Sequence, residues 1–159
     1  MFATTFSSVQ QVNEFAQTVF GYDEAKRGQA QAVLELAKGR NVCAVLPTNY
    51  GKSFIYQAFA SALAQKQLSY YVVIICPLLA LAQDQLRLPD GVKGVIVNSY
   101  NKTSPDECRR ISSGYYQILF ISPEVLVENA ATDPRGSWLK TLKRVCLFGI
   151  DEAHKVIEW

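Results

Sequence analysis

Two short stretches carry side chains that could bind phosphates and a metal ion. The first is PTNYGKS at residues 47–53, between an apolar run at 41–46 and a helix-like run that begins at Ser53. A strand that enters such a turn can point backbone N–H groups at an anion, with Lys52 for the outer phosphates and the Ser53 hydroxyl for Mg²⁺. The alternative is a surface lysine in a chance Gly-Lys-Ser.

The second stretch is DEAH at residues 151–154, directly after the apolar run 145–150. Phosphoryl transfer needs one carboxylate for the metal and one to polarise the attacking water, and Asp151 and Glu152 supply such a pair. Alone, an acidic pair after a strand could equally be a turn or a helix cap. His154 is the only histidine, and a moderately buried polar residue is its alternative interpretation.

Strands and helices alternate along the whole chain. Apolar runs at 41–46, 70–76, 92–97, 117–121 and 145–150 predict strands, and helical periodicity predicts helices at 9–20, 24–38, 54–67, 78–88, 105–112, 123–129 and 138–144. This order is typical of an α/β fold with a parallel sheet and helices on both faces, in a single domain over residues 1–159. Ligands gather at the carboxyl ends of such strands, where all the candidate motifs fall.

Composition limits the remaining possibilities. With 49% hydrophobic and 19% charged residues, the chain has a globular composition. Its net charge of +2 is too small to indicate a polyanionic partner. The four cysteines do not have metal-ligand spacing. Three of them, Cys43, Cys76 and Cys146, lie in apolar runs, and we expect these to be reduced core residues. No apolar run is long enough for a membrane span, and we see no signal peptide.

Together, five motifs in order resemble the RecQ family of superfamily 2 DNA helicases, over residues from about 15 to 159. They are FGYDEAKRGQ at 20–29, PTNYGKS at 47–53, VIICPLLALAQDQ at 73–85, LFISPE at 119–124 and DEAH at 151–154. The resemblance implies a RecA-like P-loop NTPase domain, the first motor half of an ATP-dependent 3′–5′ DNA helicase. It also implies ATP and Mg²⁺ as cofactors, DNA as partner, a second motor domain and a location in the nucleus.

The resemblance assigns roles to individual residues. Tyr22 would stack on adenine and Gln29 would read its edge, with Lys26 beside them. Glu152 would be the catalytic base, Ser53 and Asp151 the Mg²⁺ partners, and His154 a link between nucleotide and DNA. The remaining nucleotide contacts would come from Thr48, Asn49, Tyr50, Gly51 and Lys52, and the DNA contacts from Pro77, Leu78, Ser122, Pro123, Glu124 and Trp159.

The chain departs from the family pattern at several of these positions. Asn49 stands where the family usually has glycine, and asparagine tolerates a left-handed backbone. Tyr50 is larger than the usual residue, and we expect it to point outward. Lys26 replaces the usual arginine, which keeps the charge but removes planar stacking.

We expect the isolated chain to bind nucleotide, to hydrolyse it slowly and not to unwind DNA. Trp159 is only the start of the family's aromatic-rich loop, and an arginine finger would come from the second motor half. One alternative is a truncated, non-enzymatic module that binds nucleotide or DNA and acts through a partner. Another is a different P-loop enzyme, such as a small kinase.

Overall fold

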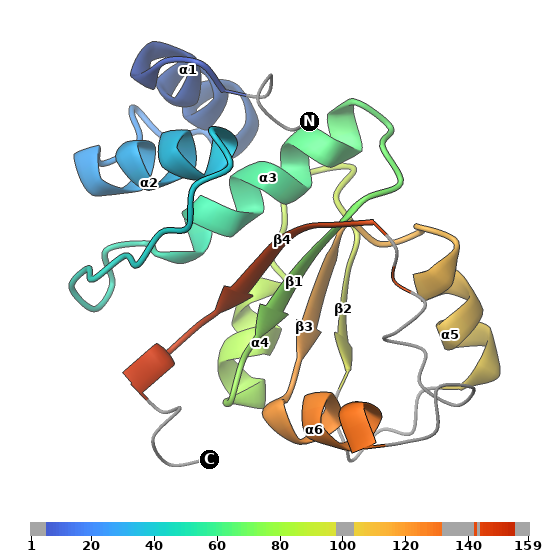
Figure 1. Cartoon of the computed structure of the whole chain (residues 1–159). Helices are drawn as coiled ribbons and strands as arrows, with labels where there is room; N and C mark the ends of the chain where they lie inside the picture. Colours follow the sequence, from blue (N-terminus) through green and yellow to red (C-terminus); the bar gives the residue numbers. More distant parts are fainter. Residues whose placement is uncertain (1–5, 98–103, 132–141, 143, 155–159) are drawn as a thin grey trace.

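The computed structural model describes residues 6–97, 104–131, 142 and 144–154. Its centre is a parallel sheet of four strands in the order β2-β3-β1-β4 (Figure 1). These strands are β1 (Tyr71–Ile75), β2 (Gly94–Val97), β3 (Ile118–Ile121) and β4 (Val145–Ile150). Each lies within a segment for which the sequence predicts a strand.

The two inner strands are buried because every residue in them is apolar. All residues of β1 and β3 are buried, and Val72 of β1 pairs with Ile118 of β3. Continuous β-branched runs suit strands that are covered on both faces. The outer strands β2 and β4 are less buried, and Phe148 in β4 is 52% exposed.

Helices cover both faces of the sheet (Figure 1). On one face the core includes Val72, Ile74 and Phe120, packed with residues of α1 (Val9–Phe20), α2 (Arg27–Ala37), α3 (Ser53–Gln65) and α4 (Leu79–Gln85). On the other face Val73, Ile75 and Leu119 pack with residues of α5 (Pro105–Ser112) and α6 (Pro123–Ala131). Successive strand residues point to opposite faces, so each strand contributes to both cores. The predicted α/β fold is confirmed.

Local signals explain where several helices begin and end. The Ser8 hydroxyl caps α1 by accepting from the backbone N–H of Gln11 at 3.2 Å, and Gly21 ends that helix with a left-handed backbone. Ser104 caps α5 in the same way through the N–H of Glu107. Gly39 follows α2 with φ +77°. From sequence alone, either Ser7 or Ser8 could cap the helix at 9–20 and Gly39 could end the helix at 24–38; the structure has Ser8 as the cap.

The predicted strand at 41–46 is wrong. These residues run beside β4 without joining the sheet, and their backbone forms no hydrogen bond with any described residue. Val45 is 90% exposed, and Cys43 is also exposed, contrary to the expectation of a core thiol. An apolar run indicates a preference for burial, but strand pairing depends on a partner far away in the sequence. Here β4 pairs with β1 on one edge, and a cavity of about 540 Å³ separates its other edge from residues 42–46.

Two expectations involve residues outside the described part of the chain. Most of the helix predicted at 138–144 falls there, and so does Trp159. In the described part, none of the helices has the length and apolar character needed to cross a membrane.

Candidate functional site

The turn at 47–53 positions a lysine and a serine at the start of a long buried helix. Ser53 is the first residue of α3, and Lys52 immediately precedes it. Asn49 and Gly51 both have left-handed backbones, with φ +60° and +83°. Asparagine and glycine tolerate this conformation better than other residues, so the turn forms without the usual glycine at 49. Thr48 and Asn49 are exposed.

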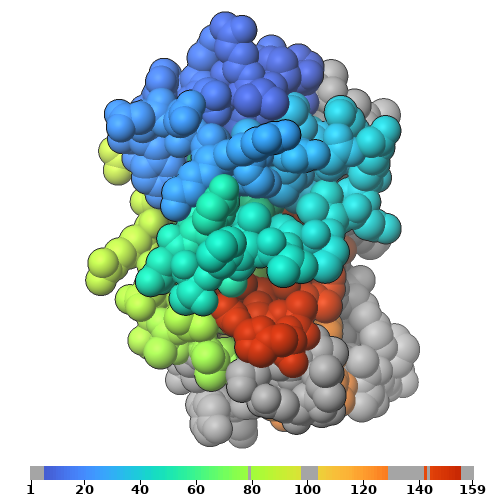
Figure 2. Space-filling model, turned by 90° about the vertical axis from the view of Figure 1, so that its left-hand side faces the viewer, coloured from blue at the N-terminus to red at the C-terminus, as the bar shows by residue number. Residues whose placement is uncertain are grey.

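Lys52, Glu152 and His154 meet at one cavity. Figure 2 shows the red end of the described chain at the surface, next to teal residues of α3. The Lys52 Nζ lies 3.9 Å from Glu152 Oε1, and His154 Nδ1 lies 3.3 Å from Glu152 Oε2. All three residues, together with Asp151, line the cavity beside β4. Glu152 has φ +52°, a backbone conformation that is strained for a non-glycine residue and common at functional sites. Side chains 100 residues apart, at 52 and 152, are therefore brought together.

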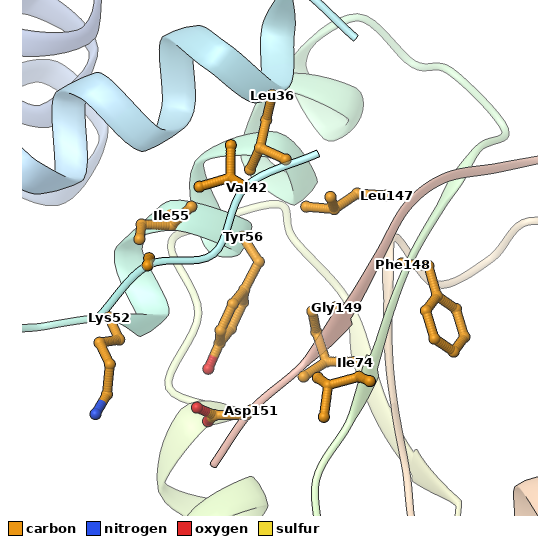
Figure 3. A pocket seen from close by; sticks show the side chains of 12 residues that line it. Leu36, Val42, Lys52, Ile55, Tyr56, Ile74, Leu147, Phe148, Gly149 and Asp151 are labelled. Atoms are coloured by element: carbon orange, nitrogen blue, oxygen red, sulfur yellow. The ribbon is translucent and has the colours of Figure 1, made fainter. Parts of the chain in front are cut away.

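Asp151 is held by hydrogen bonds of both its backbone and its carboxylate. Its backbone N–H donates to Ile75 O at 2.9 Å, which attaches it to the end of β1. Its Oδ1 accepts from the backbone N–H of Glu152 at 3.0 Å, and its Oδ2 accepts from Gln85 Nε2 at 2.8 Å. Figure 3 shows this carboxylate at the lower end of a smaller cavity, below the hydroxyl of Tyr56.

The residues predicted to bind adenine border a separate cavity of about 620 Å³. This cavity extends to the turn at 47–53, which we call the phosphate turn after its predicted role. Tyr22 is 47% exposed and packs on Phe20, with ring centroids 5.6 Å apart. Gln29 is buried, and its Nε2 donates to Tyr50 O at 3.0 Å and Gly51 O at 2.8 Å. Its Oε1 accepts from the backbone N–H of Lys26 at 2.8 Å. The amide therefore holds the phosphate turn, and reading a base would require an exchange of these bonds.

The expectation that Tyr50 points outward is wrong. Its ring is half-buried, and the Lys26 ammonium lies 4.7 Å from the ring centroid, within cation–π range. The same ammonium donates to Tyr50 O at 3.1 Å. A cation at the start of α2 attracts the ring, so the aromatic side chain packs against the adenine motif.

The predicted DNA residues follow β1 and β3 at the same edge of the sheet as Asp151. Leu78 is 49% exposed and Glu124 is exposed, whereas Ser122 and Pro123 are buried and Pro77 is half-buried. The Ser122 backbone N–H donates to Val97 O at 3.0 Å, which links this turn to β2. Parallel order places all these turns at the carboxyl ends of the strands. None of the predicted DNA residues in the described part of the chain lines the cavity that Lys52 and Glu152 share.

The sequence analysis assigned no role to three residues around Asp151, although one of them lies in the motif at 73–85. Gln85, at the end of α4, bonds to Asp151, and Gln57 Nε2 in α3 donates to Gln85 O at 3.0 Å. Tyr56, also in α3, points its hydroxyl at Asp151 (Figure 3). The polar residues at 83–85 interrupt a leucine-rich run, which was a signal that one of them has a polar partner.

Comparisons with known proteins show the family to which this chain belongs. The DEAD/DEAH box helicase family model matches residues 26–159. The chain is 34% identical over 160 residues to the "ATP-dependent DNA helicase Q-like 5" of Arabidopsis thaliana, covering 98% of this chain and 16% of that protein. It is 29% identical to the "ATP-dependent DNA helicase RecQ" of Haemophilus influenzae, covering 90% and 22%. The chain thus spans less than a quarter of the length of either relative.

A solved structure supports the fold. The DUF1998 helicase MrfA bound to DNA matches with a TM-score of 0.63 and 19% identity, covering 89% of this chain and 20% of that one. At this identity the similarity bears on the fold alone. The family model covers most of the chain, and both relatives described above are helicases of the RecQ type that the motifs predict. The chain therefore belongs to the DEAD/DEAH box helicase family and resembles its RecQ members.

Proposed function

We propose that this chain is the ATP-binding first motor half of a RecQ-like, ATP-dependent 3′–5′ DNA helicase. Lys52 receives the β- and γ-phosphates, and Glu152 polarises the attacking water. The observation that carries the proposal is the approach of Lys52 Nζ to Glu152 Oε1, 3.9 Å apart at the carboxyl edge of the sheet. A phosphate-binding cation and a general base must face the same small volume for phosphoryl transfer to water.

Ser53 and Asp151 are suited to Mg²⁺. Magnesium usually takes one or two carboxylates and hydroxyls from the protein, and completes its shell with substrate phosphates and water. One hydroxyl and one carboxylate, from Ser53 and Asp151, fit this preference. Among the described residues, no group of three or more His, Cys, Asp or Glu side chains offers a metal site made by the protein alone. When bound, the ion neutralises charge on the phosphates. The protein's part is to hold the Asp151 carboxylate still.

The role of Lys52 in nucleotide binding can be tested by measuring how tightly the whole chain binds a fluorescent ATP analogue. We expect Lys52→Ala to weaken binding by about tenfold to a hundredfold, because a charge-assisted hydrogen bond contributes about 1.5–3 kcal/mol. The matched control is Lys66→Ala, which removes an exposed lysine at the other end of α3. Equal affinity of wild type and Lys52→Ala would show that residues 47–53 do not bind phosphates.

Hydrolysis separates the base from the binding residues. We expect Glu152→Gln to bind the analogue at least as well as wild type, because the amide removes a negative charge near the phosphates. Phosphate release should then fall to background. We also expect slow release by the isolated wild-type chain, since the arginine finger would come from a second motor domain. Rapid DNA-stimulated release by this chain alone would contradict that expectation.

The proposed DNA path runs along the ends of β1 and β3. It is supported by the exposure of Leu78 and Glu124 at the edge that also carries Asp151. We expect Leu78→Asp to weaken binding of fluorescently labelled single-stranded DNA, measured by anisotropy, because it adds negative charge beside a polyanion. Val9→Asp is the control, since Val9 in α1 has the same 49% exposure. An equal effect of both substitutions would argue against this path. A nuclear location is part of the proposal and rests on the family resemblance.

A further inference from the structure

Gln85 joins three elements beside the candidate metal carboxylate. Its Nε2 donates to Asp151 Oδ2 at 2.8 Å, across 66 residues of sequence. Its backbone carbonyl accepts from Gln57 Nε2 at 3.0 Å. Gln57 lies in α3, the helix that begins at the phosphate turn. The end of α4 is therefore connected both to the phosphate-turn helix and to Asp151.

The contact is costly to keep, which points to a role beyond packing. Gln85 Oε1 is buried and has no hydrogen-bond partner among the described residues. A buried polar atom without a partner destabilises the folded protein. An apolar side chain of the same length would avoid that cost but would also lose the charge-assisted bond to Asp151. The two effects oppose each other, so stability alone does not select glutamine at this position.

Tyr56 adds a second donor on the same side of the carboxylate. Its hydroxyl points at Asp151 (Figure 3), and it is buried without a hydrogen-bond partner in the described part of the chain. A tyrosine hydroxyl is a donor at neutral pH, so it can approach the same carboxylate as the Gln85 amide.

The two oxygens of Asp151 are thus restrained separately. Oδ1 accepts from the N–H of Glu152, and Oδ2 accepts from Gln85. Two hydrogen bonds to different oxygens fix the plane of a carboxylate, whereas one allows rotation about its Cβ–Cγ bond. Each oxygen still has acceptor capacity for a cation.

We propose that Gln85 is a positioning residue that holds the Asp151 carboxylate in the orientation required for Mg²⁺-dependent nucleotide binding. The inference rests on the proposed function. Gln85 acts only through Asp151, because its amide donates to that carboxylate and to no other described residue. Its loss should therefore affect binding of the nucleotide–magnesium complex and leave metal-free binding unchanged.

The test uses Gln85→Met, which keeps the length of the side chain and removes its donor. Gln83→Met is the control, because Gln83 is an exposed residue of the same helix. Affinity for a fluorescent ATP analogue is measured with Mg²⁺ and with EDTA, and the ratio of the two affinities is the readout. We expect Gln85→Met to lower this ratio about tenfold, with the EDTA affinity changed less than twofold. Gln83→Met should change neither.

Two further measurements separate positioning from a structural role. The thermal midpoint of Gln85→Met should lie close to that of wild type, because removal of the unpaired Oε1 offsets loss of the bond to Asp151. In an Asp151→Asn background, Gln85→Met should cause no additional loss of the magnesium effect. Gln57→Met, which removes only the bond to Gln85 O, should give a smaller loss in the same direction and serves if Gln85→Met does not fold.

The possible results are distinct. An unchanged ratio in Gln85→Met would overturn the inference and leave the proposed function intact. Equal losses with Mg²⁺ and with EDTA, accompanied by a lower thermal midpoint, would assign Gln85 a structural role and also overturn it. Absence of nucleotide binding by the wild-type chain in both conditions would refute the proposed function itself, and the inference with it.

Discussion

Gly51→Ala tests how the adenine motif supports the phosphate turn. Gly51 has φ +83°, and an added Cβ would lie 2.7 Å from Gln29 Nε2. A left-handed alanine costs about 1–2 kcal/mol. Stiffening of the unfolded chain offsets about 0.4–1 kcal/mol of that cost. Moving the Gln29 amide would also break its bonds to Tyr50 O and Gly51 O, at about 0.5–1.5 kcal/mol each.

Gly39→Ala isolates the backbone part of this cost. Gly39 has φ +77°, but a Cβ there would meet nothing within 4 Å. We therefore expect urea unfolding to show a larger loss for Gly51→Ala than for Gly39→Ala, by about 1–3 kcal/mol. Binding of the fluorescent ATP analogue should weaken in Gly51→Ala alone, because only that substitution moves the phosphate turn.

A double-mutant cycle identifies the cause. In a Gln29→Ala background the clash is absent, so Gly51→Ala should cost no more than Gly39→Ala. If Gly51→Ala and Gly39→Ala were equally destabilised in the presence of Gln29, the turn would be free to move. Gln29 would then not hold the phosphate turn, and the reasoning would be wrong.

Three further predictions concern buried groups and the sheet edge. Tyr56→Phe should change the unfolding free energy little or raise it, because its buried hydroxyl has no hydrogen-bond partner among the described residues. Tyr71→Phe should instead cost about 1 kcal/mol by losing a 2.6 Å bond to Ile111 O, and urea titrations compare the two variants. Burial raises the pKa of the Cys146 thiol from 9.0 to about 12, so between these values the thiol ionises only in the unfolded chain. The free energy of unfolding should therefore fall as pH rises from 9 towards 12, and it should fall less in Cys146→Ala. Among the described strands, β4 pairs on one side only, whereas β3 pairs on both sides. Amides of β4 should therefore exchange hydrogen faster than those of β3 in mass-spectrometric measurements. Equal protection would indicate that another segment covers β4.

Local and short-range signals account for most of the fold that could be predicted. The buried strands β1 and β3 are continuous apolar runs, and Ser8 and Gly39 mark helix ends by the chemistry of their own side chains and backbones. Placement of the motifs on one edge followed from parallel order alone. The strands and helix ends depend on residues close together in the sequence, so one sequence is enough to find them.

Features that depend on distant partners could not be predicted in the same way. The run at 41–46 has the composition of a buried strand, but whether it pairs is decided by β4, about a hundred residues later. The Lys26 ammonium draws the Tyr50 ring inward, although nothing in residues 47–53 indicates such a contact. The bond between Gln85 and Asp151 spans 66 residues, and nothing in the sequence around either residue indicates the other as its partner.

The contact between Lys52 and Glu152 is weaker than the hydrogen bonds of Gln29. Under the proposed function, this difference determines which part of the nucleotide binds at the lower cost. Lys52 and Glu152 are 33% and 25% exposed and 3.9 Å apart, and ion pairs with such access to water contribute only about 0–1 kcal/mol. Phosphates can therefore replace Glu152 as the partner of Lys52 at small cost, which leaves Glu152 free to act on water. Gln29 must instead exchange three hydrogen bonds before it can read a base. Phosphate contacts should thus supply most of the binding free energy, and recognition of adenine the smaller part.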